Sequence, residues 1–331
     1  MPVECLVMLR VGTGGWAYFR VPGTSSLRAY SSAFDFVEVN STYYSHPNPR
    51  TVSLWRKVVP PDFDFSVRCH RSIVDALASK RGARLGDVVR RMERTCKILN
   101  ASVLTVLLPT DRAAPSQQAK GLRELLSTFG ANGTRMAVEF RGGPPSDDAL
   151  ETMKEGEAIH SVDISREEPK YESDILYSRL FGKGQQNIYE FDDGELQSIA
   201  LRASAPKFEK SILAFHGVRM YRDGARLKAF LRTGDFPMVT GQAGLDSLRS
   251  VLAEDTKFPT SKAELVSLQG WKLFDASPRQ RVRAAGPLSR LPEGTYRSLD
   301  SVISNLRNLP LADNPAKAPL ASERVYSGFR I

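Results

Sequence analysis

Eight short apolar runs recur between residues 9 and 216 of this 331-residue chain, and a pattern of helical spacing follows most of them. The runs are rich in Val, Ile, Leu and Phe, which favour strands. They are Leu9–Thr13, Phe36–Asn40, Phe63–Arg68, Val103–Leu108, Met136–Arg141, Ile159–Ile164, Ile175–Phe181 and Ile212–His216. Strand followed by helix, repeated eight times, predicts a (β/α)8 TIM barrel of the α/β class. A doubly wound sheet, the alternative, usually contains fewer such units.

The pattern changes after the eighth run, where Gly234-Asp235-Phe236-Pro237 ends the barrel. Downstream, Ser261 and Ser298 each precede a helical pattern, as N-cap residues do. We therefore predict a TIM barrel over residues 1–234 and a helical connector over 235–257. Residues 258–331 are expected to form a small, basic, mostly helical C-terminal module with a tail.

The composition limits the class of protein and its location. Apolar residues make up 41% and charged residues 25% of the chain, as in an ordinary globular protein. We expect no membrane span, since no apolar run is long enough, and no signal peptide at the N-terminus. Three scattered cysteines are typical of reduced thiols in the cytoplasm. The net charge of +9 favours an anionic partner such as nucleic acid.

Three acidic residues fall where a barrel would place catalytic groups, at the carboxyl ends of strands. These are Glu38, Glu139 and Asp163. Glu38 lies between two valines, so it must be paired, hydrated or protonated if buried; alternatively it faces water from an edge strand. Converging acids and cations shift one another's pKa, as acid–base catalysis requires. The alternative is that Glu139–Arg141 and Asp163–Arg179 are structural ion pairs.

Cations and aromatic residues gather at the same strand ends. Arginine matches phosphate oxygens, and aromatic rings stack on bases or sugars. The residues predicted to bind substrate or phosphate are Gly14, Trp16, Asn40, Tyr43, Tyr44, Arg68, Arg141, Arg179, Lys183 and His216. In the module, Arg279, Arg281 and Arg283 are predicted to bind nucleic acid. A solvated basic rim is the alternative to these assignments.

The four histidines, His46, His70, His160 and His216, have none of the short spacings of metal motifs. We therefore assign no metal ligand and name no cofactor, and a divalent metal ion stays open. No serine or cysteine lies in a nucleophile elbow, which disfavours acyl-enzyme chemistry.

Several of these segments occur in the order found in a known family. The matching segments are Val11–Trp16, Val37–Tyr44, Thr51 with Trp55, Phe63–Arg68, Glu139–Arg141, Asp163 and Tyr177–Gly182. With them the chain resembles the YecE-like family of uncharacterised TIM barrels (domain of unknown function 72) over roughly residues 9–232. The resemblance implies the barrel fold but no activity, because the family is known mainly as a fold. Residues 258–306 resemble, more weakly, another small uncharacterised module.

The sequence departs from that family at three positions. The family usually has lysine where Arg68 stands, histidine where Phe181 stands and Phe-Asn-Asn where Phe215-His216-Gly217 stands. Arginine keeps the charge of lysine but has no nucleophilic amine, so Schiff-base chemistry at residue 68 is excluded.

These features together predict an acid–base enzyme that acts on a phosphate-bearing substrate, with nucleic acid favoured. The reaction would be hydrolysis of a phosphodiester or N-glycosidic bond, as in a nuclease or DNA-repair enzyme. Glu38 or Glu139 would be the general acid or base, with Asp163 as its partner. A sugar-phosphate isomerase or lyase and a non-catalytic nucleic-acid-binding protein are the alternatives. The oligomeric state is not predicted.

Overall fold

The computed structural model describes residues 7–78, 85–111, 114–130 and 133–312, which form two compact units. The first unit runs to Phe181 and includes residues 201–216; the second contains residues 182–200 and the chain from Gly217 onward. The predicted domains, 1–234, 235–257 and 258–331, stay a prediction, because compactness does not test independent folding. The predicted tail, from residue 313, lies outside the described residues.

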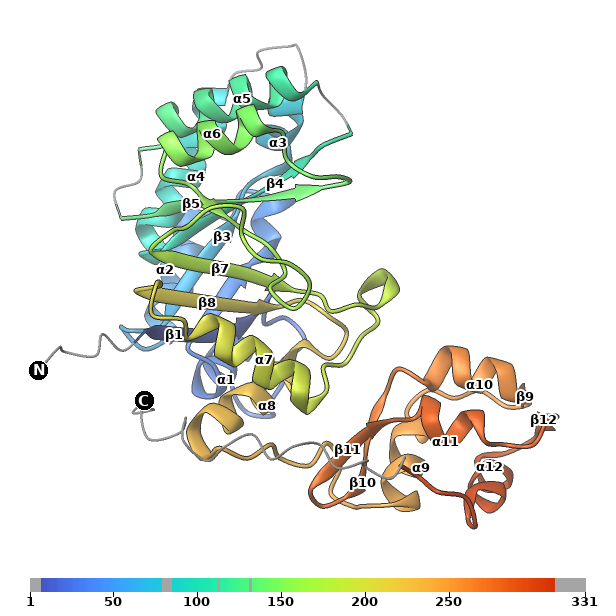
Figure 1. Cartoon of the computed structure of the whole chain (residues 1–331). Coiled ribbons are helices and arrows are strands. Elements are labelled where there is room, and N and C mark those ends of the chain that lie inside the picture. Colours follow the sequence, from blue (N-terminus) through green and yellow to red (C-terminus); the bar gives the residue numbers. More distant parts are fainter. Residues whose placement is uncertain (1–6, 79–84, 112–113, 131–132, 313–331) are drawn as a thin grey trace, which may run out of the picture. The chain divides into compact units, whose positions relative to one another are not determined.

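The first unit is built on eight parallel strands that form a nearly closed barrel (Figure 1). Their order is β6-β5-β4-β3-β2-β1-β8-β7, and a parallel bridge between Val162 and Ser178 joins the two ends. The strands are β1 (Met8–Thr13), β2 (Phe36–Val39), β3 (Asp64–Arg68), β4 (Val103–Pro109), β5 (Arg135–Arg141), β6 (Ile159–His160), β7 (Ile175–Leu180) and β8 (Lys210–Phe215). The predicted TIM-barrel fold is confirmed.

Helices connect most of the strands, and α3, α5 and α6 pack side by side outside the sheet (Figure 1). The helices that follow the strands are α1 (Ser26–Ala33), α2 (Pro49–Val58), α3 (Arg71–Ala78), α4 (Leu85–Leu99), α5 (Pro115–Thr128), α6 (Asp147–Glu155), α7 (Asp193–Ala203) and α8 (Met220–Thr233). Asn48 and Ser146 cap α2 and α6 with their side chains. The sequence did not predict α3 or the short 3-10 helix η1 (Asn40–Tyr43).

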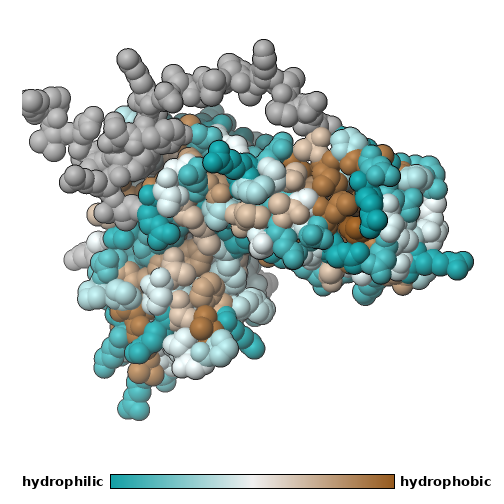
Figure 2. All heavy atoms as spheres, turned by 90° about the horizontal axis from the view of Figure 1, so that it is seen from below, coloured by the Kyte–Doolittle hydropathy of each residue, from teal (hydrophilic) through white to brown (hydrophobic). Residues whose placement is uncertain are grey.

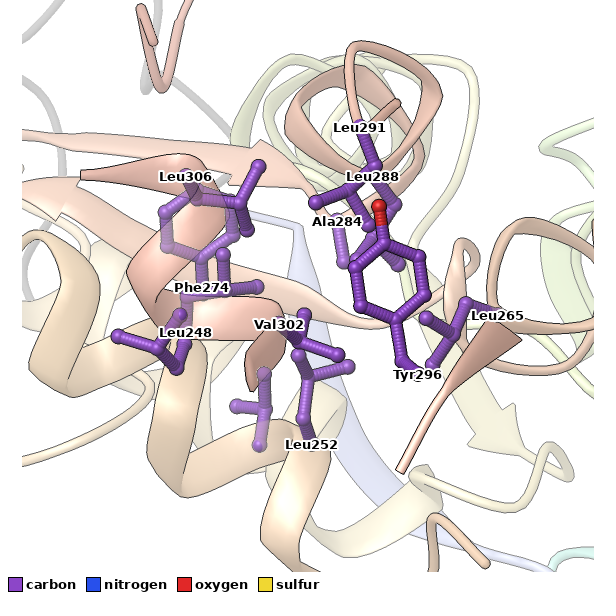
Figure 3. Packing of buried hydrophobic residues seen from close by; sticks show 12 residues of the cluster. Leu248, Leu252, Leu265, Phe274, Ala284, Leu288, Leu291, Tyr296, Val302 and Leu306 are labelled. Atoms are coloured by element: carbon purple, nitrogen blue, oxygen red, sulfur yellow. The ribbon is translucent and has the colours of Figure 1, made fainter. Parts of the chain in front are cut away.

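Within the described residues of the second unit, the chain after α8 contains four helices and two short antiparallel pairs of strands; α9 lies in the predicted connector and the other elements in the predicted module. Its elements are α9 (Leu245–Ala253), β9 (Thr260–Ser261), α10 (Lys262–Gln269), β10 (Leu273–Ser277), β11 (Gln280–Arg283), α11 (Ala285–Ser289), β12 (Thr295–Tyr296) and α12 (Leu299–Leu306). Leu248, Phe274, Leu288 and Val302 lie in a shared apolar core (Figure 3). The same unit contains a short 3-10 helix, η2 (Gln185–Asn187).

The outer surface in Figure 2 is a mixture of hydrophilic areas and smaller hydrophobic ones. Within the described residues, no helix has the length and apolar character needed to cross a bilayer.

Candidate active site at the carboxyl ends of the barrel strands

An apolar layer and a polar layer of side chains lie next to each other inside the barrel. The apolar layer includes Phe36, Val103, Ala137, Tyr177 and Ala214. Two residues further along the same strands stand Glu38, Thr105, Glu139, Arg179 and His216. Because side chains on a strand alternate between faces, a residue two positions on points the same way. The two glutamates, Arg179 and His216 therefore gather inside the barrel, next to the apolar layer and nearer the carboxyl ends of the strands.

Glu38 and Arg179 form the centre of this polar layer. Arg179 donates from Nε to Glu38 Oε2 at 2.9 Å and from Nη2 to Oε1 at 3.0 Å, and both side chains are fully buried. Burial raises the pKa of Glu38, but Arg179 and then His216 hold that pKa well below its usual value. Burial lowers the pKa of Arg179, but Glu38 and Glu139 raise it overall. A buried Glu38 was expected to be paired, hydrated or protonated, and the structure shows it paired with Arg179.

Tyr177 fixes the second oxygen of Glu38 from below. Its hydroxyl donates to Glu38 Oε2 at 2.7 Å and lies 2.7 Å from Ser66 Oγ. Burial and the neighbouring Glu38 raise the pKa of Tyr177 well above its usual value, so the hydroxyl keeps its proton. Tyr177 was not among the residues predicted for the site. Its position two residues before Arg179 on the same strand was the signal that could have identified it.

Glu139 joins this buried pair to the mouth of the barrel. One of its oxygens accepts a hydrogen bond from Arg179 Nη1, and the other lies 2.6 Å from Arg141 Nη2. The Arg141 side chain is 44% exposed and that of Glu139 is 13% exposed, in contrast to 2% for Arg179. The guanidinium carbon of Arg141 also lies 4.7 Å from the ring centroid of Phe181. Glu139 is thus the acidic group of this cluster that solvent reaches.

His216 is nearly buried beside Glu38. Its Nε2 lies 3.5 Å from Glu38 Oε1 and has no hydrogen-bond partner. Its ring stacks on that of Phe181, with centroids 4.9 Å apart. Burial and the charge of Arg179 lower the pKa of His216, so the free protein holds a neutral imidazole at pH 7. The stacked pair consists of two of the residues that depart from the family pattern.

A second group of predicted residues surrounds Asn40 at the start of η1. The Asn40 amide donates to the carbonyl of Gly14, and its oxygen accepts from Arg68 Nη1 at 3.1 Å. The Arg68 guanidinium lies 4.0 Å from the ring centroid of Tyr43, a cation–π contact. The Nε of Arg68 is buried and has no partner. Arg68 is therefore held in place while retaining an unused hydrogen-bond donor.

Tyr44 and Trp16 are the other aromatic residues that were predicted to contact substrate. Tyr44 is 64% exposed and packs edge-on against Tyr43, with ring centroids 5.0 Å apart. Trp16 packs edge-on against Trp55 of α2 at 5.3 Å. Both leave ring surface available, and their predicted role in stacking stays a prediction.

Asp163 and Lys183 have other partners. Asp163 accepts from the backbone N–H of Phe181 at 2.8 Å and from the Ser165 hydroxyl at 2.6 Å, so it braces the strand ends. Arg179, the partner considered for it, instead binds Glu38 and Glu139. Lys183, in the second unit, lies 3.1 Å from Glu195. Their catalytic and phosphate-binding roles stay predictions.

The three module arginines differ in their surroundings. Arg281 Nε lies 2.6 Å from Asp193, and Arg283 Nη2 lies 3.1 Å from Glu195. The side chain of Arg281 is only 6% exposed. Arg279 is exposed at the turn between β10 and β11. Arg279 is the exposed one of the three, and the predicted nucleic-acid contact remains a prediction for all three.

Within the described ranges, His, Cys, Asp and Glu side chains form no group of three or more suited to a metal ion. His46 and His70 do stack, with centroids 4.2 Å apart, and His70 Nδ1 lies 2.8 Å from Ser72 Oγ. His160 accepts from the backbone N–H of Lys170. The structure thus assigns no set of metal ligands.

A parallel eight-stranded barrel with charged residues at its carboxyl end defines the chain as a TIM-barrel protein. It belongs to the family described as "Protein of unknown function DUF72", whose model matches residues 10–233. The predicted family is therefore confirmed. No curated protein matches the chain.

Solved structures of the same family share the fold. A DUF72 family protein from Thermotoga maritima MSB8 is 18% identical, with a TM-score of 0.54, over 68% of this chain and 99% of its own. One from Enterococcus faecalis V583 is 16% identical, with a TM-score of 0.53, over 67% and 96%. An AP endonuclease of family 2 from Brucella melitensis is 11% identical, with a TM-score of 0.45, over 69% and 99%. The likeness to the two DUF72 family structures concerns the barrel fold alone.

Proposed function

We propose that the polar layer is the active site of a hydrolase that acts on a phosphate-bearing substrate, with nucleic acid as the favoured class. The observation that carries the proposal is the Glu139–Arg141 pair at the end of β5, in which the cation is 44% exposed and the acid 13% exposed. Substrate can reach both groups there, whereas a purely structural pair would be expected to be enclosed.

The charge balance of the site supports an anionic substrate. Arg68, Arg141 and Arg179 face Glu38 and Glu139, and His216 is neutral, so the cluster has one positive charge in excess. Arg68 also has an unpartnered buried donor, and such a donor costs about 1–3 kcal/mol unless a ligand or water satisfies it. A phosphate group offers both the negative charge and the acceptor oxygens that this arrangement lacks.

Glu139, rather than Glu38, is the group we assign to acid–base chemistry. Glu38 is fully enclosed and accepts hydrogen bonds from Arg179 and Tyr177. Glu139 has one oxygen bound by the buried Arg179 and the other bound by the exposed Arg141. Arg141 is the more exposed partner of this pair, so a phosphate that binds Arg141 would free one Glu139 oxygen to activate water.

A non-catalytic nucleic-acid-binding protein is the second candidate. It is favoured by the fact that both acids of the layer are bound by arginine, as bracing groups would be. Salt dependence and product formation separate the two functions, because a binder loses affinity steeply with ionic strength and forms no product.

The test is a panel of labelled oligonucleotides, single- and double-stranded, intact or carrying uracil, abasic or deaminated sites, with EDTA, Mg²⁺ or Mn²⁺. Glu139→Gln should abolish turnover without lowering the melting temperature. Arg135→Gln is the matched control, because Arg135 begins the same strand and pairs with Asp174. Cleavage by wild type that is lost only in Glu139→Gln supports the hydrolase. Binding without cleavage supports the second candidate, and neither binding nor cleavage overturns both.

A further inference from the structure

Two strongly exposed aromatic side chains lie where the chain leaves β1 and β2. Tyr18 follows β1 and is 81% exposed, and Tyr44 follows β2 and is 64% exposed. These are the highest values among the exposed large hydrophobic side chains of the described residues. Because β1 and β2 pair in parallel, both loops leave the barrel at neighbouring carboxyl ends. Exposed apolar groups that gather at this end of a barrel indicate a binding surface.

Hydrogen bonds join these two loops to each other and to the end of β3. The Asn40 side-chain amide donates to the carbonyl of Gly14, and the Thr42 hydroxyl donates to the carbonyl of Arg68 at 2.6 Å. The three stretches thus form one connected surface, which we call the loop platform. It runs from each strand end through the first turn of the next helix and comprises residues 14–29, 40–52 and 68–74.

The aromatic rings of the loop platform are held by their neighbours. The Arg68 guanidinium lies against the ring of Tyr43, and Tyr43 packs edge-on against Tyr44. Trp16 packs edge-on against Trp55 in the same way. Rings that are already positioned lose little conformational freedom when a ligand binds, so they suit stacking.

The loop platform is also basic. It contains no aspartate or glutamate, whereas residues 142–150 and 161–168, after β5 and β6, contain five acidic residues and one arginine. The side of the mouth formed by the loop platform is therefore the side that attracts a polyanion. Its arginines, all exposed except the half-buried Arg68, are Arg20, Arg28, Arg50, Arg68 and Arg71.

We propose that the loop platform binds single-stranded nucleic acid, with unpaired bases stacked on Tyr44 and Tyr18 and with phosphates bound by the exposed arginines. The inference rests on the proposed function, because it names the substrate class of the same site. Arg68 connects the loop platform to the polar layer, since it contacts Tyr43 and Asn40 and contributes to the charge cluster of that layer. A strand on the loop platform would thus run beside the acids assigned to catalysis.

The combination of exposed rings and arginines favours a single strand over other anions and over sugars. Bases inside a duplex are already stacked on both faces, whereas an unpaired base offers its face to an aromatic side chain. A neutral polysaccharide could stack on the rings but would leave the arginines without a counter-charge. A small phosphosugar would need the charges but not two exposed rings in two different loops.

The first measurement is fluorescence anisotropy with three labelled probes at one salt concentration. The probes are an oligothymidylate, the same strand annealed to its complement, and a strand of equal length made only of abasic sites. Wild type should bind the oligothymidylate more tightly than either other probe, because that probe alone offers unpaired bases. Equal or tighter binding of the duplex, or absence of binding to all three probes, would overturn the inference.

Variants of Tyr44 test the stacking itself. Tyr44→Ala should weaken binding of the oligothymidylate about 5- to 150-fold, the loss of one stacked base, and should leave binding of the abasic strand unchanged. Tyr44→Phe keeps the ring and should bind both probes as wild type does. Met8→Ala is the control, because Met8 is 52% exposed at the opposite end of β1. A loss in Tyr44→Ala that is equal for both strands, or no loss, contradicts base stacking at this residue.

The salt dependence of binding tests the arginines. Arg50→Gln should reduce the slope of log affinity against log salt by about one for the oligothymidylate and the abasic strand alike. Arg94→Gln is its control, because Arg94 is equally exposed but lies in α4, outside the loop platform. Identical slopes in the two variants would show that Arg50 contacts no phosphate and would remove the first turn of α2 from the surface.

Failure of this inference and failure of the proposed hydrolase give different results. Cleavage of oligonucleotides by wild type with KM unchanged in Tyr44→Ala overturns the loop platform and leaves the hydrolase. Binding that depends on Tyr44 without any product supports the loop platform and overturns the hydrolase in favour of the non-catalytic binder. Cleavage with KM raised in Tyr44→Ala and kcat unchanged supports both.

Discussion

Glu38 and Arg179 bind each other with two hydrogen bonds across the barrel, although 141 residues separate them in the chain. They come from β2 and β7, which are not neighbours in the sheet, so the pair joins opposite parts of the barrel wall. The same guanidinium also binds Glu139 from β5. A single buried arginine thus connects three strands, β2, β5 and β7.

Replacement of this arginine should strongly destabilise the barrel. Arg179→Met leaves Glu38 fully buried without its main partner, and loss of one partner of a buried pair costs about 3–5 kcal/mol. Arg135→Met, which removes a more exposed pair with Asp174, should cost about 0–1 kcal/mol. Urea denaturation of the two variants measures the difference. A loss below about 1 kcal/mol for Arg179→Met would contradict the paired, charged state of Glu38.

His160 should make the fold sensitive to mild acid. Burial lowers the pKa of this residue to about 4. The contribution of His160 to stability is therefore complete above the ordinary histidine pKa of about 6.5 and is lost as the pH falls towards 4. Between these pH values His160 binds a proton in the unfolded chain but not in the folded one. The free energy of unfolding should fall by roughly 2 kcal/mol between pH ~7.5 and ~5.

The variant that tests this is His160→Asn, whose side-chain oxygen offers the acceptor that Lys170 N–H needs. Its free energy of unfolding should vary less over that pH range, as urea denaturation at the two pH values measures. A pH dependence identical to that of wild type would show that another group is responsible.

Alanine at position 14 should disturb both the fold and His216. Its Cβ would lie 2.2 Å from the His216 ring and 3.0 Å from the Asn40 amide nitrogen, and such overpacking costs about 1–3 kcal/mol. Gly241→Ala is the matched control, because its Cβ meets nothing within 4 Å. Thermal denaturation and the imidazole NMR signals of His216 report the two effects. Unchanged His216 signals in Gly14→Ala would show that the ring does not lie against β1 as described.

The module arginines should separate into two classes. Arg279→Gln should leave stability unchanged and, if the turn contacts nucleic acid, reduce the slope of log affinity against log salt by about one. Arg281→Gln should instead lower the melting temperature, because Arg281 is nearly buried against Asp193. Filter binding at several salt concentrations and calorimetric melting measure both. An unchanged salt slope in Arg279→Gln would remove the turn from the binding surface.

Much of the barrel could be predicted from the sequence, because buried parallel strands are continuous apolar runs and each is bounded by polar residues. The strand of Phe36 begins at the predicted residue. The sequence missed α3, which begins at Arg71, only two residues after β3 ends, without a Gly or Pro turn signal between them.

The site was only partly predictable, for a different reason. Glu38, Glu139 and Arg141 were recognisable because charged residues interrupt apolar runs at strand ends. The partner of Arg179 was not, because pairs across a barrel depend on how the strands close, which local spacing does not reveal. Tyr177 was missed because an aromatic residue in a strand is usually core, and here its ring is core while its hydroxyl belongs to the polar layer.

Side chains along β2 point alternately to the two faces of the strand, and this alternation affects how the barrel folds. Val37 and Val39 are fully buried on the face opposite Glu38. A slip of β2 by one residue would exchange the two faces, moving the carboxylate away from Arg179 and into apolar surroundings at a cost of several kcal/mol. The buried Glu38–Arg179 pair thus also penalises misaligned strands, so the barrel closes in one register.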